Sequence, residues 1–351
     1  SSSSLKSWTT SGKVYHITGS LDIQTDVVWG PDVEVLVDAD ARIEVEESGS
    51  LTIKEGVKVL LGDDAYIQVG YGTSGKFIAV GTKEKPVVFT KSSSNQSTWG
   101  HDNYAGIILD SKITGDSKLD YCVIEYASAG IYANEIPVKV TNCTIRNNKN
   151  YGIQFHSRAM PKYTSTFTGN KISNNGKYPI MISADGVSRL PGDIVFTNNT
   201  NNKIYVEGGD VVSSGTWRKQ EVPYEIKGRV SIEQPSGVSI TIAAGTVCEL
   251  NEDAYIEVGY GDPGTLIAKG TKDDPIIFTC SVDGAFWGND HYAGIIISNK
   301  ATNNTTLQYC RIENATTGVY ATGVSALNIS NCEIKNNKNN GIIFYDGASP
   351  K

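Results

Sequence analysis

Four side chains in the middle of the chain are the candidates for acid–base chemistry: Glu125, Arg146, His156 and Arg158. On strands with alternating side chains, Glu125 would lie beside Arg146 on the outward face of the fold. That face could grip a uronic-acid polymer, with His156 or Arg158 acting as the base. The alternative is an exposed ion pair of Glu125 with Arg146, worth roughly 0 to 1 kcal/mol. We favour the ion pair, because the positions that correspond to His156 and Arg158 later in the chain carry a tyrosine and a glycine.

Two loops of related sequence carry the candidates for ligand binding. Their shared residues are Trp99, Asp102 and Tyr104 in the first loop and Trp287, Asp290 and Tyr292 in the second. Aromatic rings stack on sugar rings, and a carboxylate accepts hydrogen bonds from hydroxyl groups, so each loop could be a carbohydrate subsite. The alternative is that Trp99 folds over its own part of the chain as a plug that shields Ile107 from water. Tyr71 and Tyr260, each within a Gly-Tyr-Gly turn, are the better exposed aromatic candidates.

The cysteines allow two interpretations and give no sign of zinc. Cys122 and Cys143 stand at equivalent positions of adjacent repeats, as do Cys310 and Cys332, so each pair lies within disulfide reach. The alternative, which we favour, is a column of free thiols that pack like small apolar side chains. No CxxC spacing occurs, and the chain has only 4 His. No acidic loop of the calcium-binding type occurs either, so we expect no cofactor and leave calcium open.

Long-range repetition organises the whole chain. Residues 65–72 return almost unchanged as residues 254–261, and residues 86–90 return as residues 275–279. The sequence therefore predicts a tandem duplication: a spacer at residues 1–7, a first module at 8–203 and a second module at 204–351. The two modules could form one continuous solenoid.

A shorter rhythm within each module predicts strands rather than helices. Short apolar runs are separated by Gly, Asn, Asp and Ser, and no window keeps the apolar spacing of a helix. A period of about 20–30 residues with strands alone is typical of a β-solenoid. In parallel coils, equivalent side chains stack, which predicts one inner column formed by Ile124, Ile145, Ile172, Ile312 and Ile334.

Asparagines precede this column and suit the corners between strands. Asn142, Asn170 and Asn331 stand two or three residues before an inner Ile. A left-handed corner favours Asn, and its amide can both donate and accept hydrogen bonds between coils. We therefore expect these three residues to form a ladder of buried amides. The alternative is an ordinary exposed turn.

Several of these segments resemble secreted bacterial proteins of the right-handed parallel β-helix type, the pectate-lyase-like superfamily. The resemblance rests on residues 245–247, 264–271 and 275–279 and on the Asn-Cys-x-Ile-x-Asn-Asn motif at residues 142–148. It implies an all-β, right-handed parallel β-helix over nearly the whole chain. The family includes adhesins, polysaccharide lyases, epimerases and glycoside hydrolases, so the resemblance implies a fold and leaves the function open.

Charge and composition narrow the function further. The 38 Asp and Glu residues outnumber the 31 Lys and Arg residues, and the net charge of -7 argues against nucleic-acid binding. No apolar run is long enough for a transmembrane segment. The serines at the start resemble the spacer after a lipidated cysteine, and we expect an exported protein at the cell surface, outside the cell or in the periplasm.

These observations lead to one expected function and one alternative. We expect a non-catalytic surface protein, such as an adhesin or lipoprotein, whose solenoid face binds a polysaccharide or another cell-surface glycan. Two similar modules would present the same turns twice, which favours avidity. The alternative is a polysaccharide lyase or glycoside hydrolase that acts on an acidic polysaccharide, and it needs an acid, a base and a charge stabiliser on one face.

Overall fold

The protein is a parallel β-solenoid. The computed structural model describes residues 7–94, 98–101, 105–291 and 293–351. Within that part of the chain the regular elements are β-strands and two short 3-10 helices, η1 (Thr164–Thr166) and η2 (Asp185–Arg189). The chain divides into two compact units: unit 1 is Ser1–Met181 with Asp193–Asn202, and unit 2 is Ile182–Gly192 with Lys203–Lys351.

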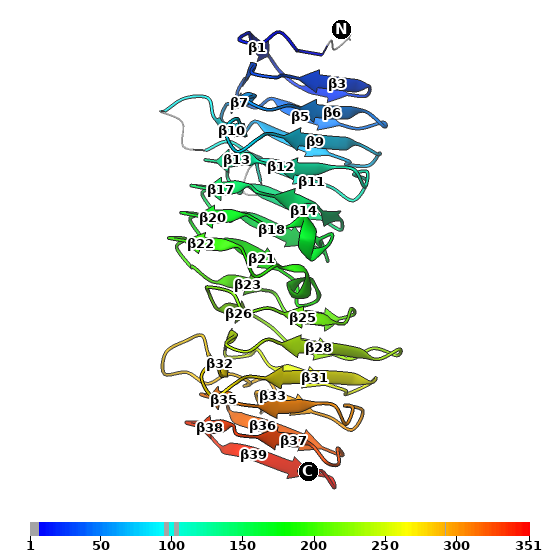
Figure 1. Cartoon of the computed structure of the whole chain (residues 1–351), viewed down its shortest axis with the longest axis vertical. Helices are drawn as coiled ribbons and strands as arrows, with labels where there is room; N and C mark the ends of the chain where they lie inside the picture. Colours follow the sequence, from blue (N-terminus) through cyan, green and yellow to red (C-terminus); the bar gives the residue numbers. More distant parts are fainter. Residues whose placement is uncertain (1–6, 95–97, 102–104, 292) are drawn as a thin grey trace. The chain divides into compact units, whose positions relative to one another are not determined.

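Unit 1 winds its strands into three main parallel sheets (Figure 1). We name each sheet after its first strand. The β1 sheet contains β1 (Val14–Ile17), β4 (Glu34–Val37), β7 (Lys58–Leu61), β10 (Val87–Lys91), β13 (Cys122–Glu125), β17 (Thr144–Arg146), β20 (Lys171–Ser173) and β22 (Val195–Thr197). The β2 sheet of unit 1 contains β2 (Leu21–Ile23), β5 (Arg42–Val45), β8 (Tyr66–Val69), β11 (Ile107–Leu109), β14 (Ile131–Asn134), β18 (Ile153–His156) and β21 (Ile180–Ile182). The β3 sheet contains β3 (Asp26–Trp29), β6 (Ser50–Ile53), β9 (Lys76–Val80), β12 (Lys118–Asp120) and β16 (Val140–Thr141), and β15 (Pro137–Val138) pairs separately with β19 (Met160–Pro161).

Unit 2 is built in the same way. The β23 sheet contains β23 (Ile204–Val206), β26 (Tyr224–Ile226), β29 (Val247–Leu250), β32 (Ile276–Cys280), β35 (Cys310–Glu313) and β38 (Glu333–Lys335). The β24 sheet contains β24 (Gly209–Val211), β27 (Val230–Ile232), β30 (Ile256–Val258), β33 (Ile295–Ile297), β36 (Thr317–Thr322) and β39 (Asn340–Tyr345). The β25 sheet contains β25 (Gly215–Trp217), β28 (Val238–Ile242), β31 (Gly264–Lys269), β34 (Thr306–Gln308) and β37 (Asn328–Ser330). The described part of the chain has no helix with the length and apolar character that a membrane crossing requires.

The core lies inside the coils, where equivalent side chains stack. Ile124 pairs with Ile145, and Ile145 pairs with Ile172, in register across β13, β17 and β20. All three are fully buried, and burial of each such side chain contributes about 1.5–3 kcal/mol. The predicted inner column is thus confirmed for these residues. Parallel strands in register produce it, because each coil repeats the inward position of its neighbour.

The predicted continuation of this column into the second half of the chain is wrong. Ile312 pairs with Ile334, but their strands β35 and β38 belong to the β23 sheet. The β1 sheet, which holds Ile124, ends at β22. The two isoleucines therefore form a column of their own, because equivalent sequence does not fix which sheet a strand joins.

A ladder of buried asparagines exists, but it uses other residues than expected. Asn148 Nδ2 donates to Asn175 Oδ1 at 2.9 Å, and Asn175 Nδ2 donates to Asn199 Oδ1 at 2.8 Å. Asn142 adopts the expected left-handed conformation, with φ 53°, but its amide donates to Asp120 instead. Asn170 is buried and bridges coils through main-chain groups, since its amide donates to the carbonyl oxygen of Val140 at 2.8 Å.

All six cysteines are free, in agreement with the free-thiol interpretation. The Cys122 thiol donates to the carbonyl oxygen of Ala79, and the Cys310 thiol donates to that of Ala268, both at 3.4 Å. Burial, together with the neighbouring thiol of Cys143, holds the pKa of Cys122 well above its ordinary value. The buried thiols of Cys122 and Cys310 are therefore inert packing groups.

Candidate functional site

A row of outward-facing side chains crosses four neighbouring strands of the β2 sheet in unit 1. Glu44 on β5 pairs with Gln68 on β8, Gln68 pairs with Ile108 on β11, and Ile108 pairs with Tyr132 on β14. Ile108 points away from the core, yet only 8% of its surface is exposed. Tyr66 and Tyr132 pack against the cluster of Ile108 with two alanines and cover it. The outer face therefore has a small apolar floor between aromatic rings.

A hydrogen-bonded carboxylate stands next to this floor. Asp110 directly follows β11 and is only 7% exposed. Gln68 Nε2 donates to Asp110 Oδ2 at 2.8 Å, and Asn134 Nδ2 donates to Asp110 Oδ1 at 3.2 Å. The carboxylate thus fixes two amide side chains that come from strands on either side of β11. Fixed amides and carboxylates are the groups that orient a hydroxyl-bearing ligand.

These residues line a hollow of about 470 Å³, and two further hollows of about 270 and 320 Å³ share Arg42 with it. Tyr71 stands in the wall of the first two and is 67% exposed. The His101 and Tyr66 rings meet in a T-shaped arrangement, with centroids 5.0 Å apart. We call this surface the β2-face groove. Its residues are Arg42, Glu44, Tyr66, Gln68, Tyr71, His101, Ile108, Asp110, Tyr132 and Asn134.

Negative charge prevails in and beside the groove. Among the described residues that line the three hollows, five are carboxylates and one is a guanidinium, which belongs to Arg42. Arg42 Nε lies 3.3 Å from Glu44 Oε1. Burial raises the pKa of Glu44 above its ordinary value; Arg42 opposes the rise, and the carboxylates of Asp22 and Glu46 add to it. The groove therefore favours neutral or cationic ligands over polyanions.

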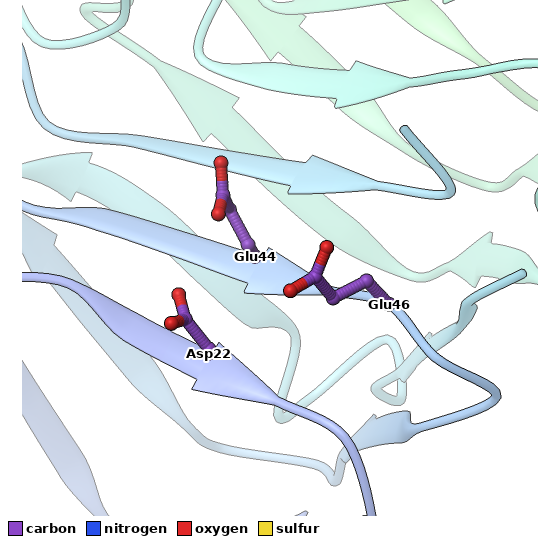
Figure 2. A group of neighbouring side chains, drawn as sticks. All are labelled: Asp22, Glu44 and Glu46. Atoms are coloured by element: carbon purple, nitrogen blue, oxygen red, sulfur yellow. The ribbon is translucent and has the colours of Figure 1, made fainter. Parts of the chain in front are cut away.

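One cluster in the described part of the chain brings three possible metal ligands together. The carboxylate oxygens of Asp22, Glu44 and Glu46 lie within 4.8 Å of one another (Figure 2). Asp22 and Glu44 pair across β2 and β5, and Glu46 follows the end of β5. Oxygen ligands of this kind suit Ca²⁺. The sequence did not indicate this cluster, because the pairing of β2 with β5 brings Asp22 beside Glu44.

The four candidates for acid–base chemistry are not gathered on one face. Arg146 Nε donates to Glu125 Oε2 at 2.8 Å, between β17 and β13 of the β1 sheet. His156 ends β18 in the β2 sheet, where its ring stacks on Tyr132 with centroids 5.6 Å apart. Arg158 lies in the turn that follows, with φ 67°. The structure thus pairs Glu125 with Arg146 and places the other two elsewhere.

The aromatic candidates fall into two groups. Tyr71 and Tyr260 are each 67% exposed and are free to meet a ligand. Trp99 and Trp287 are fully buried, and their indole N–H groups donate to main-chain carbonyl oxygens, so neither ring offers a face to a ligand. This burial agrees with the loop-plug interpretation. Asp290 is exposed, and Asp102, Tyr104 and Tyr292 lie outside the described residues.

The fold defines the class of protein as a parallel β-solenoid with a grooved outer face. The sequence model of the family described as "Right handed beta helix region" matches residues 88–201 and 264–351, more than half of the chain. The protein therefore belongs to the right-handed β-helix family, as the resemblance implied, and is consistent with the pectate-lyase-like superfamily. No match was found among curated proteins or among solved structures.

Proposed function

We propose that the protein binds a neutral glycan chain in the β2-face groove and does not cleave it. The observation that carries the proposal is the apolar floor at Ile108, flanked by Tyr66 and Tyr132 and bordered by the Asp110 hydrogen-bond network. A sugar ring has apolar C–H faces and a rim of hydroxyl groups. Aromatic and aliphatic side chains match the faces, and fixed amides and carboxylates match the rim.

The charge of the groove supports a neutral ligand over a uronic-acid polymer. A uronate chain would bring its carboxylates close to Glu44 and Asp110, and the guanidinium of Arg42 already lies beside Glu44. Like charges facing one another across a binding surface disfavour binding. A neutral polysaccharide meets no such repulsion.

The arrangement of the charged groups supports binding without cleavage. Glycosidic hydrolysis generally needs a general acid at the leaving oxygen and a second carboxylate, acting as base or nucleophile, across the scissile bond. Glu125 is paired with Arg146 on the β1 sheet, away from the strands that form the groove. In the groove, the carboxylate of Asp110 is held by two amides. These groups are arranged to orient a ligand.

We further propose that the protein works outside the cytoplasm, at a cell surface, where it contacts glycans as an adhesin does. The resemblance to exported β-helix proteins supports this location. We also propose that residues 8–203 and 204–351 are duplicated modules, which the near-identity of residues 65–72 and 254–261 supports. The coding sequence upstream of residue 1 tests the location: an export signal with a lipidated cysteine is the expected result, and its absence from the full gene would contradict it.

Binding to defined sugars tests the proposed ligand. We would titrate the full chain with cellohexaose, xylohexaose, mannohexaose, maltohexaose and polygalacturonate by calorimetry. We expect at least one neutral hexasaccharide to bind and polygalacturonate to bind more weakly. Tyr132→Ala should weaken that binding by about tenfold, which corresponds to about 1.4 kcal/mol of lost stacking. Tyr71→Ala should also weaken it.

A matched control and two outcomes make this test decisive. Tyr163→Ala removes an exposed tyrosine that does not line the groove, and it should leave binding unchanged. No binding of any neutral hexasaccharide, or tighter binding of polygalacturonate, would overturn the proposal. New reducing ends or unsaturated products during incubation would replace it with a hydrolase or a lyase.

A further inference from the structure

Unit 2 carries an outward-facing row with the same pattern as the β2-face groove. On the β24 sheet, Ser231 pairs with Glu257, Glu257 pairs with Ile296, and Ile296 pairs with Tyr320. Ile296 corresponds to Ile108: it points away from the core, yet it is only 3% exposed. Tyr255 and Tyr320 pack around it. A second apolar floor between tyrosines thus lies on a second sheet face.

A second hollow of about 290 Å³ lies over this floor, lined in part by Glu257, Tyr260, His291 and Tyr320. Tyr260 stands at its wall and is 67% exposed, as Tyr71 is in unit 1. The His291 ring stacks on Tyr255, with centroids 4.8 Å apart. We call this surface the β24-face hollow. The aromatic side chains around this hollow resemble those around the β2-face groove, where the rings of Tyr66 and His101 are also in contact.

The polar groups of the two surfaces differ. Ser298, which lines the β24-face hollow, follows β33 as Asp110 follows β11, so the buried carboxylate of unit 1 is replaced by a hydroxyl. The carboxylates that line the hollow are instead Glu257, which lies on the strand itself, and Asp346. Arg229 Nη1 lies 3.3 Å from Glu257 Oε2, and Arg229 Nη2 lies 2.7 Å from Asp210 Oδ1. The stacking surface is thus kept while the hydrogen-bonding groups around it are rearranged.

We infer that the β24-face hollow is a second glycan-binding site, which accepts a neutral sugar chain but selects a different pattern of hydroxyl groups from the β2-face groove. This inference rests on the proposed function of the groove. Apolar floors and exposed tyrosines bind the ring faces of many sugars, whereas the placement of carboxylate, amide and hydroxyl groups selects among them.

Two sites on one chain have a consequence for polymers. A polysaccharide that occupies one site raises the local concentration of its own sugars at the other, so the second contact becomes intramolecular. A polymer that binds at both sites should therefore bind more tightly than a short sugar that occupies one site, without any contact beyond those of the two sites.

Single-site variants of the full chain test the inference with the same four neutral hexasaccharides. We expect at least one hexasaccharide whose binding falls at least tenfold in Tyr320→Ala and in Tyr260→Ala but is unchanged in Tyr132→Ala. Tyr260 lies on an exposed turn, so its variant keeps the test valid if Tyr320→Ala fails to fold, which far-ultraviolet circular dichroism would reveal. Tyr163→Ala, which removes an exposed tyrosine that lines neither the β24-face hollow nor the β2-face groove, is the control.

The outcomes separate this inference from the proposed function. If every hexasaccharide that binds is lost in Tyr132→Ala and unaffected by Tyr260→Ala and Tyr320→Ala, the second site is overturned and the groove stands. If binding depends on Tyr260 and Tyr320 alone, the groove is overturned and the second site stands. If no hexasaccharide binds the wild-type chain, both are overturned.

Discussion

The indole Nε1 of Trp99 donates a hydrogen bond to the main-chain carbonyl oxygen of Glu125 at 2.8 Å. The indole also lies against Gly106, where a Cβ atom would overlap the ring. Trp287 makes the same bond to the carbonyl oxygen of Glu313, at 2.9 Å. Each loop is thus anchored to the next coil by a buried indole, which satisfies a polar group at a strand end.

The first prediction concerns this anchor. Trp99→Ala should lower the free energy of unfolding by about 3–5 kcal/mol, because it leaves a large cavity and removes the hydrogen bond to Glu125. Urea unfolding, monitored by circular dichroism, would measure this loss in the free energy of unfolding. Tyr71→Ala removes an exposed ring and should change the free energy by less than about 0.5 kcal/mol. Equal stability of the two variants would show that Trp99 does not anchor its loop.

The second prediction concerns the asparagine ladder. Asn175 accepts hydrogen bonds from the main-chain N–H and the amide of Asn148, and its own amide donates to Asn199. Asn175→Ala leaves these buried groups unpaired, at about 1–3 kcal/mol for each group that finds no partner. We expect a loss of more than about 2 kcal/mol in urea unfolding. Asn201→Ala, at an exposed position, should cost little, and a similar loss in both variants would contradict the ladder.

The inner column could be predicted from the sequence because it depends on local information. Alternation of side chains along a strand places Ile124 inside, and the repeat places Ile145 and Ile172 at the same position of the next coils. The prediction of the asparagine ladder chose the wrong asparagines, because local sequence does not distinguish the two ends of a strand. Both Asn142 and Asn148 flank the same strand, and sequence alone does not say which corner faces the core.

The candidate site was mostly missed because it depends on register between distant strands. Gln68 and Asp110 are 42 residues apart, and only the pairing of β8 with β11 brings them together. Gln68 did leave a signal, as a polar residue between the inward-facing Ile67 and Val69. Aligning the coils by such alternation would have placed Gln68, Ile108 and Tyr132 in one row.

The third prediction concerns thiol reactivity. The neighbouring thiol of Cys310 holds the pKa of Cys332 below its ordinary value, and partial burial only partly opposes this. Burial raises the pKa of Cys248 to about 12. Because the thiolate is the nucleophile, iodoacetamide should alkylate Cys332 before Cys248. Peptide mass spectrometry would identify the site, Cys332→Ser is the control, and labelling of Cys248 at the same rate would contradict the assignment.

The fourth prediction concerns the turn that carries Tyr260. Glu233 Oε2 accepts hydrogen bonds from the main-chain N–H groups of Gly261 at 2.6 Å and of Asp262 at 3.4 Å. Burial alone would raise the pKa of Glu233, but these bonds and one from Ser231 hold it below its ordinary value of 4.5. A lowered pKa means that the folded state favours the carboxylate. The stability that Glu233 contributes is therefore present above about pH 4.5 and is lost as the pH falls through its folded-state pKa.

Glu233→Gln separates this contribution from that of other carboxylates. The variant should melt at a lower temperature than the wild type at neutral pH, and the difference should shrink below about pH 4 as Glu233 is protonated in the wild type. Thermal unfolding of the variant and of the wild type, at a series of pH values from neutral to acidic, measures both melting temperatures. Glu84→Gln, at an exposed turn, is the matched control and should show no such narrowing. A constant difference across the whole pH range would mean that the Glu233 carboxylate does not hold the turn, and Tyr260 would then owe its position to other contacts.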